Sequence, residues 1–556
     1  MDDDFGVEEV TGTSVHGQSP AGGLYFGMIS GTSLLAALRR YWGYDSFLPL
    51  QEKIVRSLLD GCDACVIMPT GGGKSLCYQL PAALLSEQTV IVISPLIALM
   101  QDQVAQLTQM GIASAALNSF LTEGQQSVVM ANAVKGKYRL LYLSPERLAR
   151  SDTIGWLQRV PVSFFAIDEA HCISEWGHEF RPEYRQLSNL RLHFPDHPIA
   201  AFTASATRRV RHDIMAQLEL RGPHKYIASF HRPNLRYIVK ECAGRTQSQL
   251  LLAALGKHSD GNIIIYSPTI ARVEGTVQFL QEKGIPAIAY HGQMDGNTRR
   301  QNQELWMSDE VRVLVGTIAF GLGINKAAVR AVIHLSLPKS IEQYYQEAGR
   351  AGRDGNPADC LLLWQKRDAG LLAHFIGQIA DPEEKERSWQ RYHTIRDFVE
   401  SKRCRHRQIC THFGEIPKWN ACEACDVCSG EPEWLGLAAQ GELSRQQSRA
   451  ASPAASPSRS KQTGTRGKSP PSEVDPGVDH ELREHLREWR RAMAKKQGIP
   501  AFLVMLDNSL DDLCRKRPRS ISELRNVWGF GERKTATYGT QILEALARYG
   551  RKSDRL

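Results

Sequence analysis

The apolar residues of the chain gather in short continuous runs, and amphipathic stretches with a helical period separate these runs. In the first part of the chain the runs are CDACVIM, TVIVIS, RLLYLS, VSFFAI and PIAAFT. Runs of this length are typical of parallel strands that are buried on both faces. The pattern starts again near residue 225 with GNIIIYSPT, IPAIAYHGQM, VRVLVGT and AVIHLSLP. We therefore predict an α/β protein with two parallel-sheet lobes, residues 31–222 and 223–368.

The segments outside these lobes differ in composition. Residues 1–30 are rich in Gly, Ser and acidic residues without periodicity, which predicts a disordered leader. Residues 369–430 have a helical pattern followed by closely spaced cysteines. Residues 431–478 form a Ser/Pro/Arg-rich linker that cannot bury a core, so we predict that it is disordered. Residues 479–556 contain four or five amphipathic helices, which predicts a small all-α domain.

Length and composition narrow the class of protein. A chain of 556 residues is too long for a single core. No apolar run reaches the roughly 20 residues that span a bilayer. The acidic N-terminus MDDDFGVEEV lacks the basic and apolar parts of a secretion signal. The twelve cysteines are therefore expected to be thiols or metal ligands, in a cytoplasmic protein that would be nucleoid-associated if bacterial.

A phosphate-binding loop follows the first apolar run. The segment PTGGGKS lies between a predicted strand and the predicted helix LCYQLPAALL. Glycines let backbone N–H groups approach phosphate oxygens, a lysine supplies positive charge, and a serine hydroxyl can ligate Mg²⁺. The helix also directs its N-terminal dipole at the same anion. The residues predicted to bind the phosphates of ATP are Thr70, Gly71, Gly72, Gly73, Lys74 and Ser75.

Two adjacent carboxylates, Asp168 and Glu169, come directly after the run VSFFAI. The carboxyl ends of parallel strands are where open α/β sheets bind ligands. One carboxylate there can hold Mg²⁺, and its neighbour can orient a water for attack on a phosphate. In the second lobe, Arg350 and Arg353 of QEAGRAGRDG are three residues apart. On a helix they would point the same way, like arginine fingers that reach an ATP held by the other lobe.

The carboxylates lead into a segment rich in aromatic residues, with Trp176, His178, Phe180, Arg181 and Tyr184. Aromatic rings and an arginine on a loop suit stacking on unpaired bases. The alternative is that these rings belong to the core. Two alternatives also stay open for the hydroxyl residues of PIAAFTASAT, which form either a relay between ATP and a bound strand or a tight turn: Thr203, Ser205 and Thr207.

Cysteines at metal-ligand spacing lie in residues 369–430. Cys422, Cys425 and Cys428 form a CxxCxxC motif, and Cys404 and Cys410 lie upstream. Tetrahedral Zn²⁺ takes four soft ligands, and tight spacing lets one turn supply several of them. The sequence therefore predicts a helical zinc-binding module with five candidate ligands.

Six motifs occur in order along the chain: MPTGGGKS, SPLIALMQDQV, DEAHCISEWGHEFRPEY, FTASAT, TIAFGLGINK and QEAGRAGRDG. With them, residues 34–430 closely resemble the RecQ family of DNA helicases, within superfamily 2. The resemblance implies ATP-driven 3′→5′ unwinding by two RecA-like lobes. It also implies action on single-stranded and on tailed or branched duplex DNA, with a role in DNA repair and recombination.

By match of motif, the resemblance assigns roles to individual residues. Tyr44 and Gln51 would recognise adenine. Asp168 and Ser75 would hold Mg²⁺, and Glu169 would be the catalytic base. The aromatic segment would couple DNA to hydrolysis through Trp176, Phe180, Arg181 and Tyr184.

Some positions depart from the family pattern. Leu48 stands where an arginine often contacts adenine, and Asn325 stands where aspartate is usual. Glu175 and Glu179 replace a common glutamine and aspartate, and none of these changes removes a catalytic group. Cys410 stands where an apolar residue is usual, so we expect it in the core. The zinc ligands are then Cys404, Cys422, Cys425 and Cys428.

The C-terminal segment resembles an HRDC (helicase and RNase D C-terminal) domain, with the landmarks IPAFLVMLDNSL, RPRSISEL and GFGERKTATYG. In the family this domain gives auxiliary DNA binding, and in some members it binds protein. Residues 479–556 hold 17 Lys and Arg against 11 Asp and Glu, which favours a polyanion. The expected phosphate contacts are Lys495, Lys496, Arg515, Lys516, Arg517 and Arg519. The winged-helix domain that usually follows the zinc module is not expected, because residues 431–478 cannot fold one.

Two alternative functions remain open at this point. The phosphate loop and the DEAH motif serve RNA helicases equally well, so the chain could be an RNA-dependent ATPase. The aromatic segment and the zinc module argue against this reading. A second alternative is a DNA-stimulated ATPase that anneals or clamps strands without net unwinding.

Overall fold

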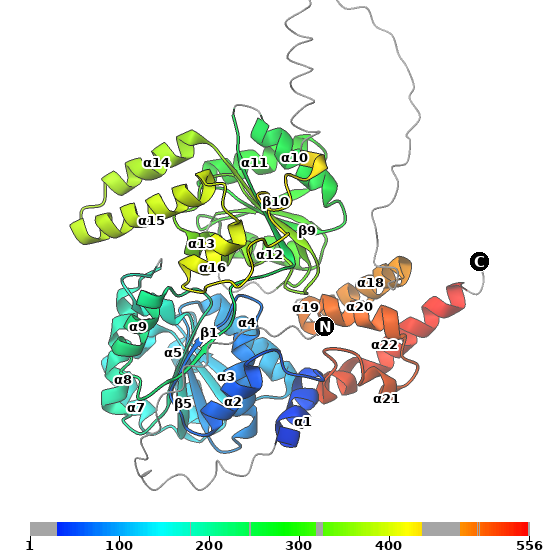
Figure 1. The fold of residues 1–556 in the computed structure, drawn as a ribbon. Coiled ribbons are helices and arrows are strands. Elements are labelled where there is room, and N and C mark those ends of the chain that lie inside the picture. Colours follow the sequence, from blue (N-terminus) through cyan, green and yellow to red (C-terminus); the bar gives the residue numbers. More distant parts are fainter. Residues whose placement is uncertain are drawn as a thin grey trace, which may run out of the picture.

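The computed structural model describes residues 31–177, 179–243, 246–317, 326–435, 479–497, 499 and 501–553. The predicted leader and residues 436–478 of the predicted linker lie outside the described residues, as do His178 and Asn325. Two α/β lobes lie one above the other, and a helical C-terminal domain packs at their side (Figure 1). Among the described residues, no helix is long and apolar enough to cross a membrane.

The first lobe contains a parallel sheet that has seven strands within the described residues, in the order β3-β4-β2-β5-β6-β1-β7. Its strands are β1 (Ala64–Ile67), β2 (Thr89–Ile93), β3 (Ser114–Leu117), β4 (Leu140–Leu143), β5 (Val162–Ile167), β6 (Ile199–Thr203) and β7 (His224–Ile227). The helices around them are α1 (Gly31–Trp42), α2 (Gln51–Leu59), α3 (Lys74–Leu84), α4 (Ile97–Met110), α5 (Glu123–Val134), α6 (Pro145–Leu148), α7 (Ser151–Leu157), α8 (Asn189–His193) and α9 (Arg208–Gln217). Two 3₁₀ helices, η2 (Ala170–Ile173) and η3 (Pro182–Ser188), follow β5.

Two edge strands of this sheet, β3 and β7, were not predicted from the sequence. Strand β3 alternates half-buried and buried positions, and the residues of β7 are exposed or half-buried, so neither gives a continuous apolar run. Strand β7 pairs with β1 in parallel, with His224 opposite Ala64. The sheet therefore continues beyond residue 222, and we place the end of the first lobe after Ile227.

The second lobe repeats the architecture. Within the described residues its parallel sheet has six strands in the order β10-β11-β9-β12-β13-β8. The strands are β8 (Leu235–Glu241), β9 (Asn262–Tyr266), β10 (Ala287–Tyr290), β11 (Val313–Gly316), β12 (Val329–His334) and β13 (Ala358–Trp364). The helices are α10 (Thr246–Lys257), α11 (Ile270–Glu282), α12 (Gly296–Met307) and α13 (Ile341–Ala348). The sequence predicted four of these strands and missed β8 and β13, and the α/β class with two parallel-sheet lobes is confirmed.

Three helices follow the second lobe, and after them comes a turn with three cysteines, residues 422–428, which is called the cysteine turn below. The helices are α14 (Lys366–Gly377), α15 (Pro382–Glu400) and α16 (Arg405–His412). The turn lies along edge strand β8, because Tyr237 donates its N–H to the carbonyl of Ala424 (3.2 Å) and accepts from the N–H of Asp426 (2.9 Å). The module thereby covers an edge that would otherwise present unpaired backbone groups.

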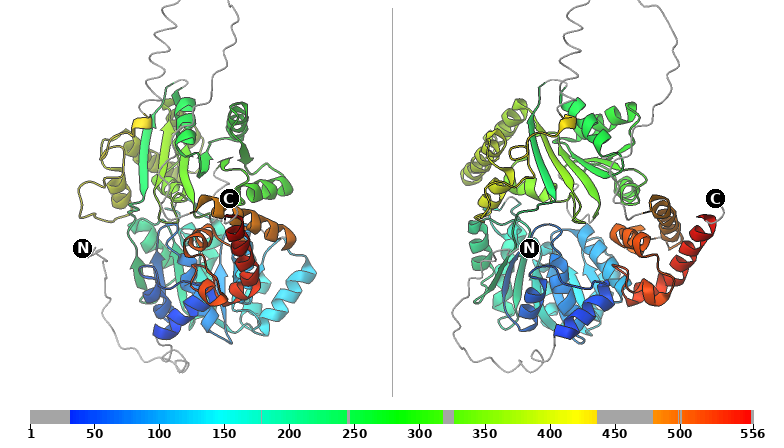
Figure 2. Two further views of the ribbon diagram at one scale, coloured as in Figure 1. Left: turned by 90° about the vertical axis from the view of Figure 1, so that its right-hand side faces the viewer. Right: turned by 45° about the vertical axis from the view of Figure 1, so that its right-hand side comes forward.

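The C-terminal domain contains α18 (His480–Gln497), α19 (Ala501–Val504), α20 (Asp507–Lys516), α21 (Ile521–Leu524) and α22 (Glu532–Ser553). It has its own hydrophobic core, which includes Leu486, Leu510 and Ile542. Both views in Figure 2 show this domain against the first lobe, on the side of α1 and α4. The predicted small all-α domain is confirmed.

Candidate functional site

The predicted phosphate loop connects β1 to α3, at the carboxyl edge of the first sheet. Gly71 and Gly73 have φ angles of 87° and 77°, a left-handed conformation that side chains disfavour. Lys74 begins α3, and its Nζ donates to the carbonyl of Met68 (3.2 Å). Burial lowers the pKa of Lys74, whereas Glu169 and Asp168 oppose that shift. The loop thus holds a lysine beside two carboxylates and directs the start of a helix at the space between them.

The two predicted carboxylates come at the end of β5. Asp168 is buried, and burial, followed by the neighbouring charge of Glu169, raises its pKa to about 7. Glu169 has a φ of 48°, also left-handed, which turns the chain sharply after the strand. A carboxylate with a raised pKa, opposite a lysine, needs further positive charge to stay ionised, and a divalent cation supplies it. Asp168 and the hydroxyl residue Ser75, which follows Lys74 at the start of α3, offer oxygen donors of the kind that Mg²⁺ takes.

Side-chain contacts lead from Glu169, through His171 and the hydroxyl residues at and just after the end of β6, to the second lobe. His171 Nδ1 lies 2.9 Å from Thr203 Oγ1 and 3.3 Å from Glu169 Oε2. Ser205 Oγ accepts from Gln346 Nε2 of α13 (2.7 Å), so β6 is tied to the other lobe. Thr207, by contrast, caps α9 by accepting the N–H of Val210.

The predicted adenine contacts are both engaged within the protein. Gln51 is buried, and its amide nitrogen lies 3.3 Å from the carbonyl of Gly73 in the phosphate loop. The ring of Tyr44 stacks on Trp528 of the C-terminal domain, with centroids 4.7 Å apart and planes 22° apart. Burial raises the pKa of the Tyr44 hydroxyl to about 12. Leu48, where the family often has arginine, is half exposed at 50%.

The two predicted arginine fingers do not share a helical turn, because α13 ends at Ala348 and the following residues form turns. Arg353 crosses to the first lobe, where a Cβ added to Gly71 would lie 3.3 Å from its Cγ. Burial and the neighbouring Arg350 lower the pKa of Arg353 to about 9. Arg350 instead lies beside the Tyr266 hydroxyl in its own lobe, where burial raises the pKa of that hydroxyl to about 12 and the charge of Arg350 opposes the rise.

Arg232, whose role was not predicted from the sequence, attaches the turn of residues 349–353 to the phosphate loop. Its guanidinium donates to the carbonyl of Thr70 (3.2 Å) in the first lobe. It also donates to the carbonyls of Gly349, Ala351 and Gly352, at 3.2, 3.1 and 2.9 Å. One side chain thereby connects the two lobes at the candidate site. Its local sequence, HRPN, gave no sign of this role.

The aromatic segment, residues 174–184, is called the coupling loop below. Trp176 is half-buried, and the guanidinium carbon of Arg209 lies 3.0 Å from its ring centroid. Phe180 has Arg185 over its ring at 5.2 Å, and Arg181 donates to the carbonyl of Pro95 (3.3 Å). These two side chains are also half-buried.

The structure corrects the prediction for Tyr184, which was expected to contact DNA. Its side chain is fully buried, and its hydroxyl donates to the carbonyl of Asp168 (3.0 Å). A ring in this position faces the core and no nucleic acid. Tyr184 therefore attaches the coupling loop to the end of β5, where Asp168 and Glu169 lie.

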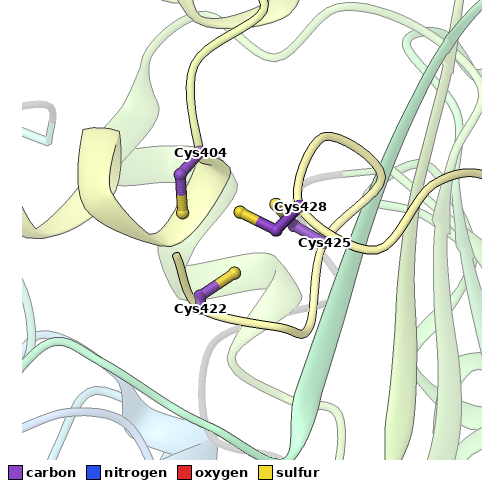
Figure 3. A group of neighbouring side chains, drawn as sticks. All are labelled: Cys404, Cys422, Cys425 and Cys428. Carbon is purple, nitrogen blue, oxygen red and sulfur yellow. The ribbon is translucent and has the colours of Figure 1, made fainter. Parts of the chain in front are cut away.

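The four predicted zinc ligands come together. Figure 3 shows their thiols pointing toward one common centre, from the start of α16 and from the cysteine turn. Their sulfur atoms all lie within 4.8 Å of one another, and the group consists of Cys404, Cys422, Cys425 and Cys428. Four thiolates at this separation fit tetrahedral Zn²⁺. Cys410 is fully buried in the hydrophobic core and outside this group, as predicted.

The basic residues predicted on the C-terminal domain differ in their surroundings. Lys516 pairs with Asp512 (2.8 Å), and Arg517 pairs with Asp479 (2.6 Å). Lys495 and Lys496 are exposed at the end of α18. Arg515 and Arg519 are exposed as well.

Family models match four successive parts of the chain. They are the DEAD/DEAH box helicase over residues 48–214, the helicase conserved C-terminal domain over 246–355, RecQ zinc-binding over 366–429 and the HRDC domain over 479–546. Among solved structures, S. cerevisiae Dbp5 bound to RNA and ADP BeF3 gives a TM-score of 0.50 at 15% identity. That likeness covers 66% of this chain and 91% of Dbp5, and it supports the two-lobed fold alone.

Full-length relatives match nearly the whole chain. The ATP-dependent DNA helicase RecQ of Pasteurella multocida is 34% identical, over 93% of this chain and 94% of the relative. The ATP-dependent DNA helicase RecQ of Bacillus subtilis is 33% identical, over 93% of this chain and 99% of the relative. With the phosphate loop, the paired carboxylates, the four-cysteine centre and the C-terminal helices in place, the chain belongs to the RecQ family of ATP-dependent DNA helicases.

Proposed function

We propose that this RecQ helicase moves 3′→5′ along single-stranded DNA and unwinds tailed or branched duplexes, in DNA repair and recombination. ATP hydrolysis at the junction of the two lobes drives this movement. The phosphate loop and Lys74 bind the phosphates. Ser75 and Asp168 hold Mg²⁺, which neutralises phosphate charge when bound, and Glu169 is the base that activates water.

One observation carries the proposal. Lys74, the two carboxylates and Arg353 meet where the lobes face each other, and the coupling loop is bonded to the same strand through Tyr184. The loop that contains Trp176 is thus joined by one hydrogen bond to the backbone of Asp168, the residue proposed to hold Mg²⁺. This arrangement supports an ATPase that responds to DNA.

The other domains have supporting roles in this proposal. The four cysteines hold Zn²⁺, which fixes the turn that covers β8. The HRDC domain gives auxiliary contacts to DNA phosphates, with Lys495, Lys496 and Arg519 as the exposed contacts. Such contacts add affinity without sequence preference. The site of action is the cytoplasm, with the nucleoid as its location if the organism is bacterial.

Strand displacement tests the proposal. A 3′-tailed duplex should be unwound with ATP and Mg²⁺, and a 5′-tailed duplex should not. Lys74→Ala should lower both ATPase turnover and unwinding at least about 100-fold, because one preorganised charge contact is worth about that much. It should still bind the tailed duplex nearly as the wild type does. Lys135→Ala is the matched control, since Lys135 is exposed at the end of α5.

Each contrary outcome has a definite meaning. Unwinding of the 5′-tailed duplex alone would reverse the polarity. DNA-stimulated hydrolysis without displacement of either duplex would favour a protein that anneals or clamps strands. Greater stimulation by RNA than by DNA would favour an RNA-dependent ATPase. Turnover by Lys74→Ala at the rate of Lys135→Ala would contradict the assignment of the phosphate loop.

A further inference from the structure

Helix α15 of the zinc-binding module contacts the coupling loop of the first lobe. Arg387 Nη1 lies 3.4 Å from Glu175 Oε2, and its guanidinium carbon lies 5.5 Å from the ring centroid of Trp176. One turn further along, Arg391 donates to the carbonyl of Gly177 (3.4 Å). Three successive residues of the loop are therefore held by two arginines on one face of a helix.

The guanidinium groups are themselves fixed by acids on the same helix. Arg387 pairs with Glu384 (3.0 Å), and Arg391 also pairs with Glu384. Arg387 is 9% exposed, which limits the screening of its charge by water. Such preorganised donors lose little side-chain freedom when they bind the loop.

The guanidinium carbon of Arg209 of α9 also lies over the Trp176 ring, 3.0 Å from its centroid. A base that stacks on this ring needs one of its faces, and two guanidinium groups lie over the ring. A base that stacks on a face of Trp176 occupied by a guanidinium group must displace that group. Contacts of this kind compete directly with DNA for the same aromatic surface.

Glu175 is the residue of the coupling loop that forms an ion pair with α15. Its carboxylate pairs with Arg387 and also with Arg185. Glutamine at this position would keep the shape of the side chain and lose its charge, so the carboxylate of Glu175 supplies the ion pair between the loop and α15.

The same helix also touches the second lobe. Phe398 of α15 packs against Tyr344 of α13, with ring centroids 5.6 Å apart. Helix α13 ends immediately before the turn that carries Arg350 and Arg353. Helix α15 thus contacts the loop that meets DNA and the helix that leads to the arginine of the ATP site.

We propose that Arg387 and Arg391 form a latch that holds the coupling loop against α15, and that DNA displaces this latch when a base stacks on Trp176. They are positioning residues, since they act on hydrolysis through the loop and do not touch the nucleotide. The latch sets how much DNA is needed to activate the ATPase. The inference rests on the proposed coupling of DNA to hydrolysis through Trp176.

The test measures ATPase rate against the concentration of single-stranded DNA. Glu175→Gln, Arg387→Gln and the double variant each remove the ion pair while keeping side chains of similar size. Each should lower the DNA concentration for half-maximal activity about three- to tenfold, as expected for one partly buried charge contact. The DNA-free rate should rise, and the maximal rate should stay unchanged. Arg396→Gln is the control, because Arg396 lies on the same helix, pairs with Glu400, and has a side chain that is 41% exposed.

The double variant separates a latch from a general loss of structure. If Glu175 and Arg387 act as one contact, the double variant should shift the half-maximal concentration no further than one single variant does. Two independent effects would add in the double variant. A general loss of structure would lower the melting temperature without changing the half-maximal concentration.

Two results would overturn the latch. One is a half-maximal DNA concentration within twofold of the wild type in all three variants, with DNA-free rates also unchanged. The other is a raised half-maximal concentration, which would mean that the arginines support the DNA-bound loop. A wild-type ATPase that DNA does not stimulate at all would instead contradict the proposed function on which the latch rests.

Discussion

Trp176 and Tyr184 lie on the same loop, eight residues apart, and have different environments. Trp176 is half-buried under two guanidinium groups, whereas Tyr184 is fully buried and bonded to the backbone of Asp168. The first ring can become available to a base by movement of side chains alone. The second is fixed in the core and joined to the backbone of Asp168. In the proposed mechanism, Trp176 therefore senses DNA and Tyr184 transmits the movement of the loop to the carboxylates.

Trp176→Ala tests this division. We expect the variant to lose the stimulation of ATPase by DNA and to lose unwinding, because the sensing ring is gone. Hydrolysis without DNA should survive, since the phosphate loop and carboxylates are untouched. The affinity for single-stranded DNA should fall by at most about 150-fold, which corresponds to stacking worth about 1–3 kcal/mol. ATPase assays with and without DNA check these outcomes.

A core residue provides the comparison for this variant. Phe164 in β5 is 1% exposed, so Phe164→Ala should cost about 3–5 kcal/mol of stability and lower the melting temperature clearly. Trp176→Ala should lower it much less, because the ring is half-exposed. If Trp176→Ala is as unstable as Phe164→Ala and still responds normally to DNA, Trp176 is a structural residue.

At the scale of elements, the cysteine turn acts as an additional partner for edge strand β8. Backbone hydrogen bonds join Tyr237 to the turn, and Arg405 forms a bidentate pair with Asp426 (3.0 and 3.1 Å). Because the turn has no regular structure of its own, the four thiolates and a metal must fix its shape. Metal binding is then part of the folding free energy of this module.

Cysteine substitutions test the zinc site. The purified protein should contain about one equivalent of zinc, as one four-cysteine site requires. Cys425→Ser should lose the metal and most of the soluble yield, because the remaining thiolates cannot complete the site. Cys410→Ala should keep the metal, since Cys410 lies in the core and outside the cysteine group. Elemental analysis of both variants measures this. A folded, active protein with less than about half an equivalent of zinc would be incompatible with the site.

At the scale of the whole molecule, the HRDC domain contacts both lobes. Trp528 stacks on Tyr44 in the first lobe. Asp309 in the second lobe pairs with Arg487 (3.2 Å) and Arg490 (3.4 Å) of the HRDC domain. Asp309 also pairs with Lys326 of its own lobe (2.6 Å). Because ATP is proposed to bind between the lobes, a domain that contacts both of them affects how they close.

Asp309→Asn tests this docking. Asp309 has a φ of 65°, and asparagine tolerates that left-handed conformation, so the backbone should be unchanged. Removal of the charge leaves three buried or half-buried cations without their common partner, which should cost about 3–5 kcal/mol. We expect a lower melting temperature and faster hydrogen exchange in α18. Asp260→Asn, at an exposed aspartate of the same lobe, is the control.

The pH dependence of HRDC docking follows from the lowered pKa of Asp309. Burial raises the pKa of Asp309, but Lys326 and Arg487 outweigh this effect and hold the pKa below its ordinary value. A carboxylate with a lowered pKa contributes its full stabilisation above about pH 4 and loses it only at lower pH. Docking of the HRDC domain should therefore be constant between about pH 6 and 8. A change in α18 exchange protection within that range would contradict the role of Asp309.

Much of the candidate site could be predicted from short stretches of the sequence. The glycines and Lys74 of the phosphate loop act together because they are neighbours in the chain, and the same holds for Asp168 and Glu169. The CxxCxxC motif places three thiols within one turn. Long apolar runs also revealed most of the central strands, since strands buried on both faces need apolar residues at every position, although the buried strand β13 was missed.

Tertiary structure alone decided the long-range pairs. Short or half-exposed edge strands such as β3 and β7 lack a continuous apolar run, so their pattern resembles that of a loop. The roles of Arg232, Trp528 and Arg387 depend on partners far away in the chain, and an arginine or tryptophan looks the same in sequence whatever it contacts. Tyr184 shows the same limit, because stacking on DNA and burial in the core both favour an aromatic ring. The chain sequence therefore determined which chemical groups are present, and the packing of lobes and modules decided which of them meet.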